Sequence, residues 1–234
     1  MHQRLSRSNW PYCDSTYPDA FSGEKDSCGV GFIASVEGNQ NHWVLSQALR
    51  GLSCMEHRGG CGADSDSGDG AGVLCEIPWS YFNKVWGKAK EIEPKSSGIG
   101  MIFMPKNLKN REIARNICEQ EAESLGLTSQ GWRDVPVNEN VLGRLARDNA
   151  PFITQWIVNI KDQGINLEAL LFRLKQRISN RANIELKQDE LGLYICSLSS
   201  KTIVYKGMVR SEILAPFYSD LKDERFEVSY AVYH

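Results

Sequence analysis

The chain has 234 residues, 41% of them hydrophobic and 24% charged, with a formal net charge of −2, which predicts a globular chain of one large domain or two small ones. The near balance of charge gives no reason to expect nucleic acid or an anionic membrane as a partner, and no apolar run approaches the roughly 20 residues of a membrane span. The seven cysteines are an odd number without the even spacing of a disulfide scaffold, which favours a reducing compartment.

Residues 1–27 are predicted to form a tail. They contain Pro11 and Pro18, scattered aromatic side chains and a polar run from Ser22 to Ser27, without helix or strand periodicity. Arg4 and Arg7 are not followed by an apolar segment, so a secretory signal is not expected. The composition fits a propeptide and a disordered terminus equally well.

The next segment, Cys28 to Val36, is predicted to be a strand and begins Cys-Gly-Val-Gly-Phe-Ile-Ala. Cys28 is the candidate nucleophile, because glycines on both sides of Val30 leave the backbone bare where a substrate can approach. If the chain is cut after Ser27, the new α-amine, with an ordinary pKa of about 8, lies beside the thiol and can act as its base. The alternative is that Cys28 is a small hydrophobe at the start of a buried strand, which is the commoner role of a lone cysteine.

A helix is predicted from His42 to Glu56, because apolar side chains recur at intervals of three and four on one face. A glycine-rich loop follows at 59–72, and three functional interpretations compete for it. The first is a metal site, because Cys54, His57 and Cys61 are spaced within reach of one ion. A structural zinc site requires four ligands, however, and no paired Cys-x-x-Cys supports these three.

The second interpretation is a phosphate cradle at Gly68 to Gly72, but the aspartates of the loop would repel a phosphate and no Gly-Lys-Ser/Thr follows. The third is a small-molecule pocket beside Cys28 in which Arg58 supplies a fixed cation. Arg58 could equally tie the loop down through carboxylates. The residues alone leave these two roles of Arg58 open.

The rest of the chain alternates predicted strands and helices, as an α/β sandwich requires. Asn166 is expected to cap a helix whose leucine stripe is interpreted as core, with a groove-binding helix as the alternative. The other helices are expected at 80–90, 109–125, 140–147 and 212–221. Strands are expected at 73–77, 98–104, 132–137, 152–160, 192–198, 202–206 and 225–233, with 192–198 and 202–206 joined as a β-hairpin.

The chain resembles the N-terminal glutaminase domain of glutamate synthases in three motifs that follow one another between Cys28 and Pro78. They are Cys-Gly-Val-Gly-Phe-Ile-Ala, a helix ending Met-Glu-His-Arg-Gly-Gly, and Ala-Asp-Ser-Asp-Ser-Gly-Asp-Gly-Ala-Gly-Val. The Glu-His-Arg-Gly element also resembles the wider class II glutamine amidotransferases. The sequence Met-Glu-His-Arg-Gly-Gly-Cys resembles the ferredoxin-dependent branch of the synthases more closely.

The resemblance implies an α+β fold of the N-terminal-nucleophile type, a four-layered αββα sandwich that is incomplete at the C-terminal end. Residues 1–27 would be a tail or propeptide, and residues 28–234 part of the glutaminase domain. The implied activity is hydrolysis of L-glutamine to glutamate and ammonia, with Cys28 as nucleophile and Arg58 supporting the cysteine loop.

For the full-length family enzyme, the resemblance implies addition of the ammonia to 2-oxoglutarate with FMN, an iron–sulfur cluster and reducing equivalents. No cofactor and no metal are expected in this segment. The implied partners are the remainder of glutamate synthase, in cis or as a second chain, and ferredoxin. The expected location is the cytoplasm, or the plastid stroma for a chain of plastid origin.

One departure from the family pattern lies at the end of the sequence. In glutamate synthases, a strand ending like Ala231-Val-Tyr-His234 continues into an arginine that holds the glutamine carboxylate, and later into an Asn-Gly that builds the oxyanion hole. The substrate clamp and oxyanion hole are therefore expected beyond His234. Loss of an oxyanion donor alone lowers rates by roughly 100-fold to 1000-fold. Two hypotheses follow: a glutaminase segment of glutamate synthase, or a catalytically incompetent fragment or split-gene subunit that needs a complementary chain.

Overall fold

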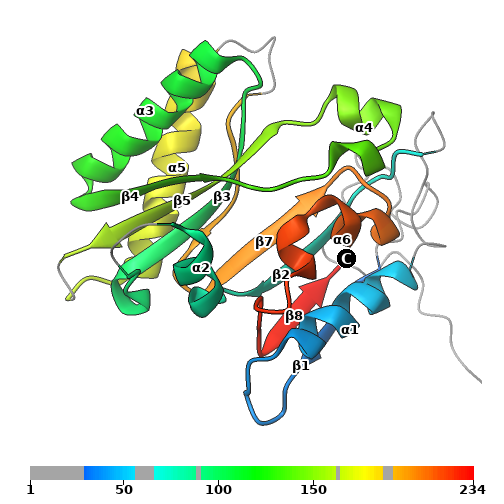
Figure 1. Cartoon of the computed structure of the whole chain (residues 1–234). Helices are drawn as coiled ribbons and strands as arrows, with labels where there is room; N and C mark the ends of the chain where they lie inside the picture. The colour runs from blue at the N-terminus through cyan, green and yellow to red at the C-terminus, as the bar shows by residue number, and fades with distance from the viewer. Residues whose placement is uncertain (1–28, 56–65, 88–90, 162–163, 187–191) are drawn as a thin grey trace, which may run out of the picture.

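The computed structural model describes residues 29–55, 66–87, 91–161, 164–186 and 192–234. These residues form two four-stranded antiparallel sheets with helices packed around them (Figure 1). Within these ranges, none of the helices has the length and apolar character needed to cross a membrane. The predicted α+β class is confirmed, and two antiparallel sheets flanked by helices are consistent with the sandwich that the resemblance implies.

The first sheet has the strand order β1-β8-β2-β7. Strand β8 lies between β1 and β2, although it comes last in the sequence. Its strands are β1 (Gly31–Ala34), β8 (Tyr230–Tyr233), β2 (Ala71–Glu76) and β7 (Thr202–Gly207).

The second sheet has the strand order β4-β5-β3-β6. Its central strands, β5 and β3, are rich in β-branched and aromatic side chains that are almost completely buried. Its strands are β4 (Leu127–Asp134), β5 (Phe152–Ile160), β3 (Ser97–Met104) and β6 (Tyr194–Ser199).

Three helices carry most of the helical structure, and each begins at an asparagine cap. The side chains of Asn41, Asn107 and Asn166 each accept a backbone N–H of the first turn, which satisfies a donor that the helix itself leaves unpaired. The helices are α1 (His42–Ser53), α2 (Trp79–Val85), α3 (Leu108–Ser124), α4 (Arg144–Asp148), α5 (Leu167–Glu185) and α6 (Leu214–Phe217), with short 3₁₀ turns at Pro94–Ser96, Glu139–Val141, Ser211–Ile213 and Ser219–Lys222.

The two faces of the second sheet contribute to two separate hydrophobic cores, because successive side chains of a strand point to opposite faces. Ile99 and Met101 of β3 belong to core 1, together with α1, α2 and one face of the first sheet. Ile102 and Met104 of the same strand belong to core 2, beneath α3 and α5. The leucine stripe of α5 lies in core 2, so its interpretation as core is confirmed.

The opposite face of the first sheet carries an apolar row that belongs to neither core. The register aligns one side chain from each strand: Phe32 with Val232, Val232 with Leu74, and Leu74 with Val204. Phe32 is 76% exposed and Val232 37%. Among the described residues, the outer face of this sheet is therefore solvent-accessible and apolar.

The second sheet is inserted between two paired strands of the first. Glu76 at the end of β2 is directly opposite Thr202 at the start of β7, and the Ile77 N–H donates to Lys201 O at 3.1 Å. The chain therefore leaves the first sheet at residue 77 and returns beside the same point at 201. All of core 2 comes from the intervening segment.

The sequence predictions are wrong most clearly in three places; in addition, the predicted helix 140–147 is interrupted at the extended Leu142, and the predicted strand 132–137 is β4, which begins at Leu127. The predicted hairpin of 192–198 with 202–206 does not form, because β6 pairs with β3 and β7 with β2. The Ser199 side chain accepts the N–H groups of Lys201 and Thr202 at 2.9 and 3.1 Å, which turns the chain from one sheet into the other.

The other two errors lie in the last 25 residues or so. The predicted helix 212–221 is broken at Tyr218, which adopts an extended conformation and packs its ring in core 1. The predicted strand 225–233 is shortened to β8: Phe226 and Val228 are buried in core 1, and Val228 forms only an isolated bridge, with Asn41.

Candidate functional site

Cys28 and Arg58, the two predicted site residues, lie outside the described residues, as do His57 and Cys61 of the metal hypothesis. The described segments beside them are well defined. Strand β1 begins three residues after Cys28, and α1 ends five residues before Arg58. The glycine-rich loop is described again from Asp66 onward.

These segments converge at one end of the first sheet, around the last residues of β8 (Figure 1). Tyr233 is opposite Gly31 of β1 on one side and Val73 of β2 on the other. His234 and Gly72 exchange both backbone hydrogen bonds, at 3.0 and 3.1 Å. The fold therefore brings the strand that follows Cys28, the end of the glycine-rich loop and the end of β8 together.

Gly68 and Gly72 are packed closely against neighbouring atoms, and Gly70 has an unusual backbone conformation. A Cβ on Gly68 would lie 2.5 Å from the backbone nitrogen of Arg210, and one on Gly72 would lie 2.9 Å from Nε2 of His234. Gly70 has a φ of +141°, a conformation that L side chains rarely adopt. At these three positions, glycine is explained by close packing and backbone conformation without a phosphate.

The loop is also fixed to the inserted segment through Ser67. This side chain is buried, and its hydroxyl oxygen accepts the backbone N–H of Ala146 in α4 at 3.0 Å. A Cβ on Gly143, at the start of α4, would lie 2.6 Å from the Ser67 nitrogen. The described part of the loop is therefore held by contacts to both halves of the molecule.

Three of the four described cysteines are poor nucleophiles. Burial raises the pKa of the Cys75 and Cys118 thiols far above their ordinary value, with a smaller contribution from the neighbouring glutamates. Burial also raises the pKa of Cys196 to about 12. Because the thiolate is the reactive form, these side chains are suited to packing and not to catalysis. Cys54 is exposed.

The described residues offer no metal centre. No group of three or more His, Cys, Asp or Glu side chains in these ranges is placed to hold an ion.

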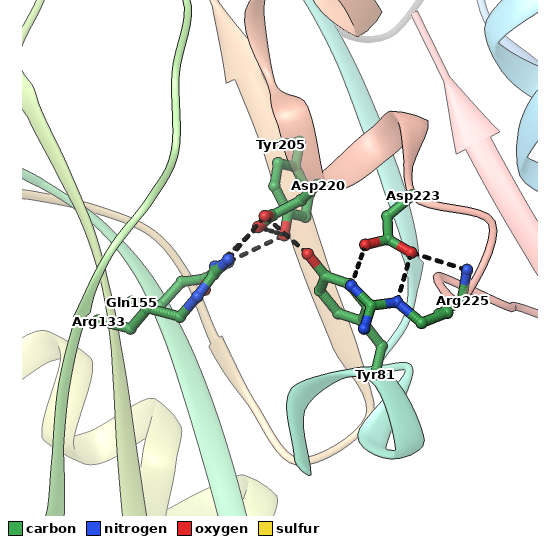
Figure 2. A network of polar contacts seen from close by, with 7 residues as sticks. All are labelled: Tyr81, Arg133, Gln155, Tyr205, Asp220, Asp223 and Arg225. Carbon is green, nitrogen blue, oxygen red and sulfur yellow. Dashed lines mark hydrogen bonds and ion pairs between the residues drawn. The ribbon is translucent and has the colours of Figure 1, made fainter. Parts of the chain in front are cut away.

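A buried polar network joins the two sheets near this end of the molecule (Figure 2). Asp220 has a fully buried side chain and accepts two hydrogen bonds from Arg133, each at 2.8 Å. The hydroxyls of Tyr81 and Tyr205 each donate to the same carboxylate at 2.8 Å. Gln155 accepts from Arg133 at 2.6 Å and donates to Tyr205 at 2.9 Å, which closes the network.

The charges of this network compensate each other. Burial would lower the pKa of Arg133, but the hydrogen bonds and charge of Asp220 outweigh burial and raise that pKa. Burial raises the pKa of Tyr205 well above its ordinary value, and the charge of Asp220 raises it further. Every member is engaged by another, so the network connects the two sheets and presents no free reactive group.

Sequence reasoning did not identify this network or the packing around Tyr233. The available signal for the network was Gln155, a polar residue in the middle of an apolar strand. The signal for Tyr233 was the pair of small residues that it contacts, Gly31 in a strand and Gly51 in a helix.

Comparison with known proteins gives a consistent result. A family model described as glutamine amidotransferases class-II matches residues 28–234. The chain is 45% identical over 216 residues to ferredoxin-dependent glutamate synthase 1, chloroplastic/mitochondrial, of Arabidopsis thaliana, and 44% identical over 216 residues to ferredoxin-dependent glutamate synthase 2 of a Synechocystis strain. Each alignment covers 90% of this chain but 13% of the relative, so the chain spans about one eighth of the length of these relatives.

Proposed function

The chain belongs to the class II glutamine amidotransferases, and from this premise we propose that it is the glutamine-hydrolysing part of a ferredoxin-dependent glutamate synthase. The reaction is L-glutamine plus water to glutamate plus ammonia. The observation that carries the proposal is the convergence at one end of the first sheet of the strand that follows Cys28, the glycine-rich loop and the end of β8.

Cys28 is the nucleophile of this reaction. Its thiolate attacks the carboxamide carbon of glutamine, the carbon–nitrogen bond breaks, and ammonia leaves after taking up a proton. Water then hydrolyses the resulting thioester, which releases glutamate and regenerates the thiol. Cleavage after Ser27 would free the α-amine of Cys28 to accept and return the proton. Arg58 supports the loop around the cysteine.

Covalent trapping tests this proposal directly. A diazoketone analogue of glutamine, 6-diazo-5-oxo-L-norleucine, loses dinitrogen when a thiolate attacks it and leaves a stable thioether. Once the downstream part of the domain is supplied, we expect peptide mass mapping to find the label on Cys28, with protection by glutamine and a mature N-terminus at Cys28. Cys75, Cys118 and Cys196 should remain unlabelled because they are buried and their pKa values are raised.

The exposed Cys54 supplies the internal control for this experiment. An accessible thiol reacts with iodoacetamide but should not react with the diazoketone faster than free cysteine does. Labelling that survives Cys28→Ala, or that spreads over Cys54 without protection by glutamine, would contradict the assignment of Cys28. Active protein that retains residues 1–27 would contradict the α-amine as base.

A second candidate is a subunit that becomes competent only when further polypeptide covers the outer face of the first sheet. The apolar row of Phe32, Val232, Leu74 and Val204 favours it, because exposed contiguous apolar surface commonly marks an interaction site. Ammonia release from glutamine separates the candidates. Turnover by the purified 234-residue chain, abolished by Cys28→Ser, would support the first, whereas turnover only after co-expression with the downstream polypeptide would support the second.

The same proposal includes the use of the ammonia by the whole synthase. Ammonia would be added to 2-oxoglutarate by the remainder of the synthase, in cis or as a second chain, with FMN, an iron–sulfur cluster and electrons from ferredoxin. The described cysteines do not fit a cluster site: none of them belongs to a group that could hold a metal, and they lie in separate elements. The plastid stroma or the cytoplasm is the proposed location, without a nucleic-acid or membrane partner.

A further inference from the structure

The ring of Tyr233 lies between strand β1 and helix α1. A Cβ on Gly31 would overlap Cζ of Tyr233 and lie 2.5 Å from its hydroxyl oxygen. A Cβ on Gly51, in the last part of α1, would lie 2.5 Å from the same oxygen and 2.8 Å from Cζ. Real Cβ atoms do not approach this closely, so an alanine at either position would force the end of the Tyr233 ring to shift.

Tyr233 is fixed mainly through its backbone. Its backbone is paired with Gly31 and Val73, and the neighbouring His234 is bonded through its backbone to Gly72. Its half-buried side chain packs against core 1. The ring therefore has little freedom to move, and the distance between β1 and α1 at this point follows from its thickness and length.

The two elements that contact the ring lead to the two predicted site residues. Gly31 lies three residues after Cys28, and Gly51 lies seven residues before Arg58. A change in the spacing of β1 and α1 therefore moves the points from which the chain leads to Cys28 and to Arg58. A displacement of about 1 Å at a reacting group can lower a rate on the order of 100-fold.

We propose that Tyr233 is a positioning residue for glutamine hydrolysis: its ring, wedged between Gly31 and Gly51, sets the spacing of the strand that follows Cys28 and the helix that precedes Arg58. This inference rests on the proposed role of Cys28 as nucleophile. The ring acts through the two elements and does not itself touch the substrate.

The test compares two rates of reaction at Cys28 in the 234-residue chain co-expressed with the downstream polypeptide that is expected to carry the substrate clamp. The rate with 6-diazo-5-oxo-L-norleucine depends on alignment of the thiol with a glutamine-like group, whereas the rate with iodoacetamide depends on thiolate content and access alone. We expect Tyr233→Ala and Tyr233→Leu to lower the diazoketone rate by more than about tenfold, with a much smaller change in the iodoacetamide rate. Tyr233→Phe keeps the ring and should restore the rate to near that of the original chain.

A double-mutant cycle tests the contact between Tyr233 and Gly31 through changes at Gly31. Gly31→Ala should lower the diazoketone rate because the new methyl group pushes on the ring, and adding Tyr233→Ala to it should cause little further loss, since the two changes act on one contact. Gly192→Ala is the matched control, because no atom lies within 4 Å of its Cβ position. Circular dichroism and thermal melts confirm that each variant compared is folded.

The outcomes separate this inference from the proposed function. If the original chain is labelled at Cys28 and Tyr233→Leu is labelled equally fast, Tyr233 does not position the nucleophile and the inference is wrong. If Tyr233→Ala and Tyr233→Leu lower both reaction rates equally, and Tyr233→Phe does not restore them, Tyr233 contributes only to packing and the inference is wrong. If Cys28 is not labelled at all even when the downstream polypeptide is supplied, the proposed function fails and the inference falls with it.

Discussion

Tyr205 illustrates how a single buried hydroxyl in this protein depends on its partners. It donates to Asp220 and accepts from Gln155, and its ring packs against Tyr218 and Phe226 in core 1. A buried hydroxyl without a hydrogen-bond partner is costly. The hydrogen bonds of Tyr205 with Asp220 and Gln155 offset this cost between the sheets. The pKa of Tyr205 is raised by burial and by the Asp220 charge, which makes the network sensitive to alkaline pH.

The pH dependence follows from the direction of this shift. In the unfolded chain Tyr205 loses its proton near the ordinary tyrosine pKa of about 10, whereas the folded chain retains the proton to higher pH. The contribution of the neutral hydroxyl to stability is therefore complete below about pH 10 and is lost as the pH rises above it. We expect the free energy of unfolding, measured by urea denaturation, to fall as the pH rises from about 9.5 to 11.

Tyr205→Phe is the matched variant for this prediction. It should lower stability at pH 8 by roughly 1–3 kcal/mol, because Gln155 and Asp220 each lose a buried partner. It should also flatten the decline between pH 8 and pH 11. A decline as steep in Tyr205→Phe as in the original chain would show that other groups, including Tyr81 and Tyr218, cause it.

At the scale of elements, the first sheet is asymmetric. One face packs against α1 and core 1, and the other carries the apolar row of Phe32, Val232, Leu74 and Val204. Val73 and Val232 belong to adjacent strands but point to opposite faces, with 1% and 37% of their surface exposed. The same substitution at these two positions therefore compares how much a side chain on each face contributes to the free energy of unfolding.

We expect Val73→Thr to lower the free energy of unfolding by roughly 1–3 kcal/mol, because it buries a hydroxyl in core 1. Val232→Thr should change it by no more than about 0.5 kcal/mol, as is usual for exposed positions. The interpretation of the outer face as an uncovered apolar surface would be wrong if Val232→Thr were as destabilising as Val73→Thr.

At the scale of the whole molecule, the inserted segment and the first sheet are joined by the network around Asp220. Arg133 and Gln155 come from the second sheet, Tyr205 from the first, and Asp220 from the 3₁₀ turn that precedes β8. A buried ion pair of this kind contributes little net stability when intact, but removal of one partner leaves the other charge buried. The junction is therefore the most sensitive point of the fold to a single charge change.

We expect Asp220→Asn to lower the free energy of unfolding by roughly 3–5 kcal/mol, since Arg133 loses its counter-ion in a buried position. Asp223→Asn is the control, because the nearby pair of Asp223 with Arg225 is partly exposed, with 24% and 54% of their side-chain surfaces accessible, so its loss should cost less (Figure 2). Urea denaturation of Asp220→Asn should also show reduced cooperativity, as the second sheet and core 2 separate from the first sheet. Equal, small effects of the two substitutions would refute the role of the junction.

The sequence alone determined the family, the α+β class and most elements. Strand β5 has its predicted bounds, Asn166 caps α5, and the leucine stripe of α5 is core, because local periodicity and capping depend on near neighbours in the chain. The roles of Cys28 and Arg58 stay predictions, since both residues lie outside the described ranges.

Only the tertiary structure decided how these elements pair. Adjacent strands β6 and β7 separate into different sheets, and β8 inserts between β1 and β2 from the far end of the chain. The wedge of Tyr233 against Gly31 and Gly51, and the approach of Asp220 to Arg133, likewise join residues distant in sequence. Periodicity indicates which face of an element is buried but not which partner covers it, because that choice depends on shape and hydrogen-bond complementarity between segments far apart in the chain.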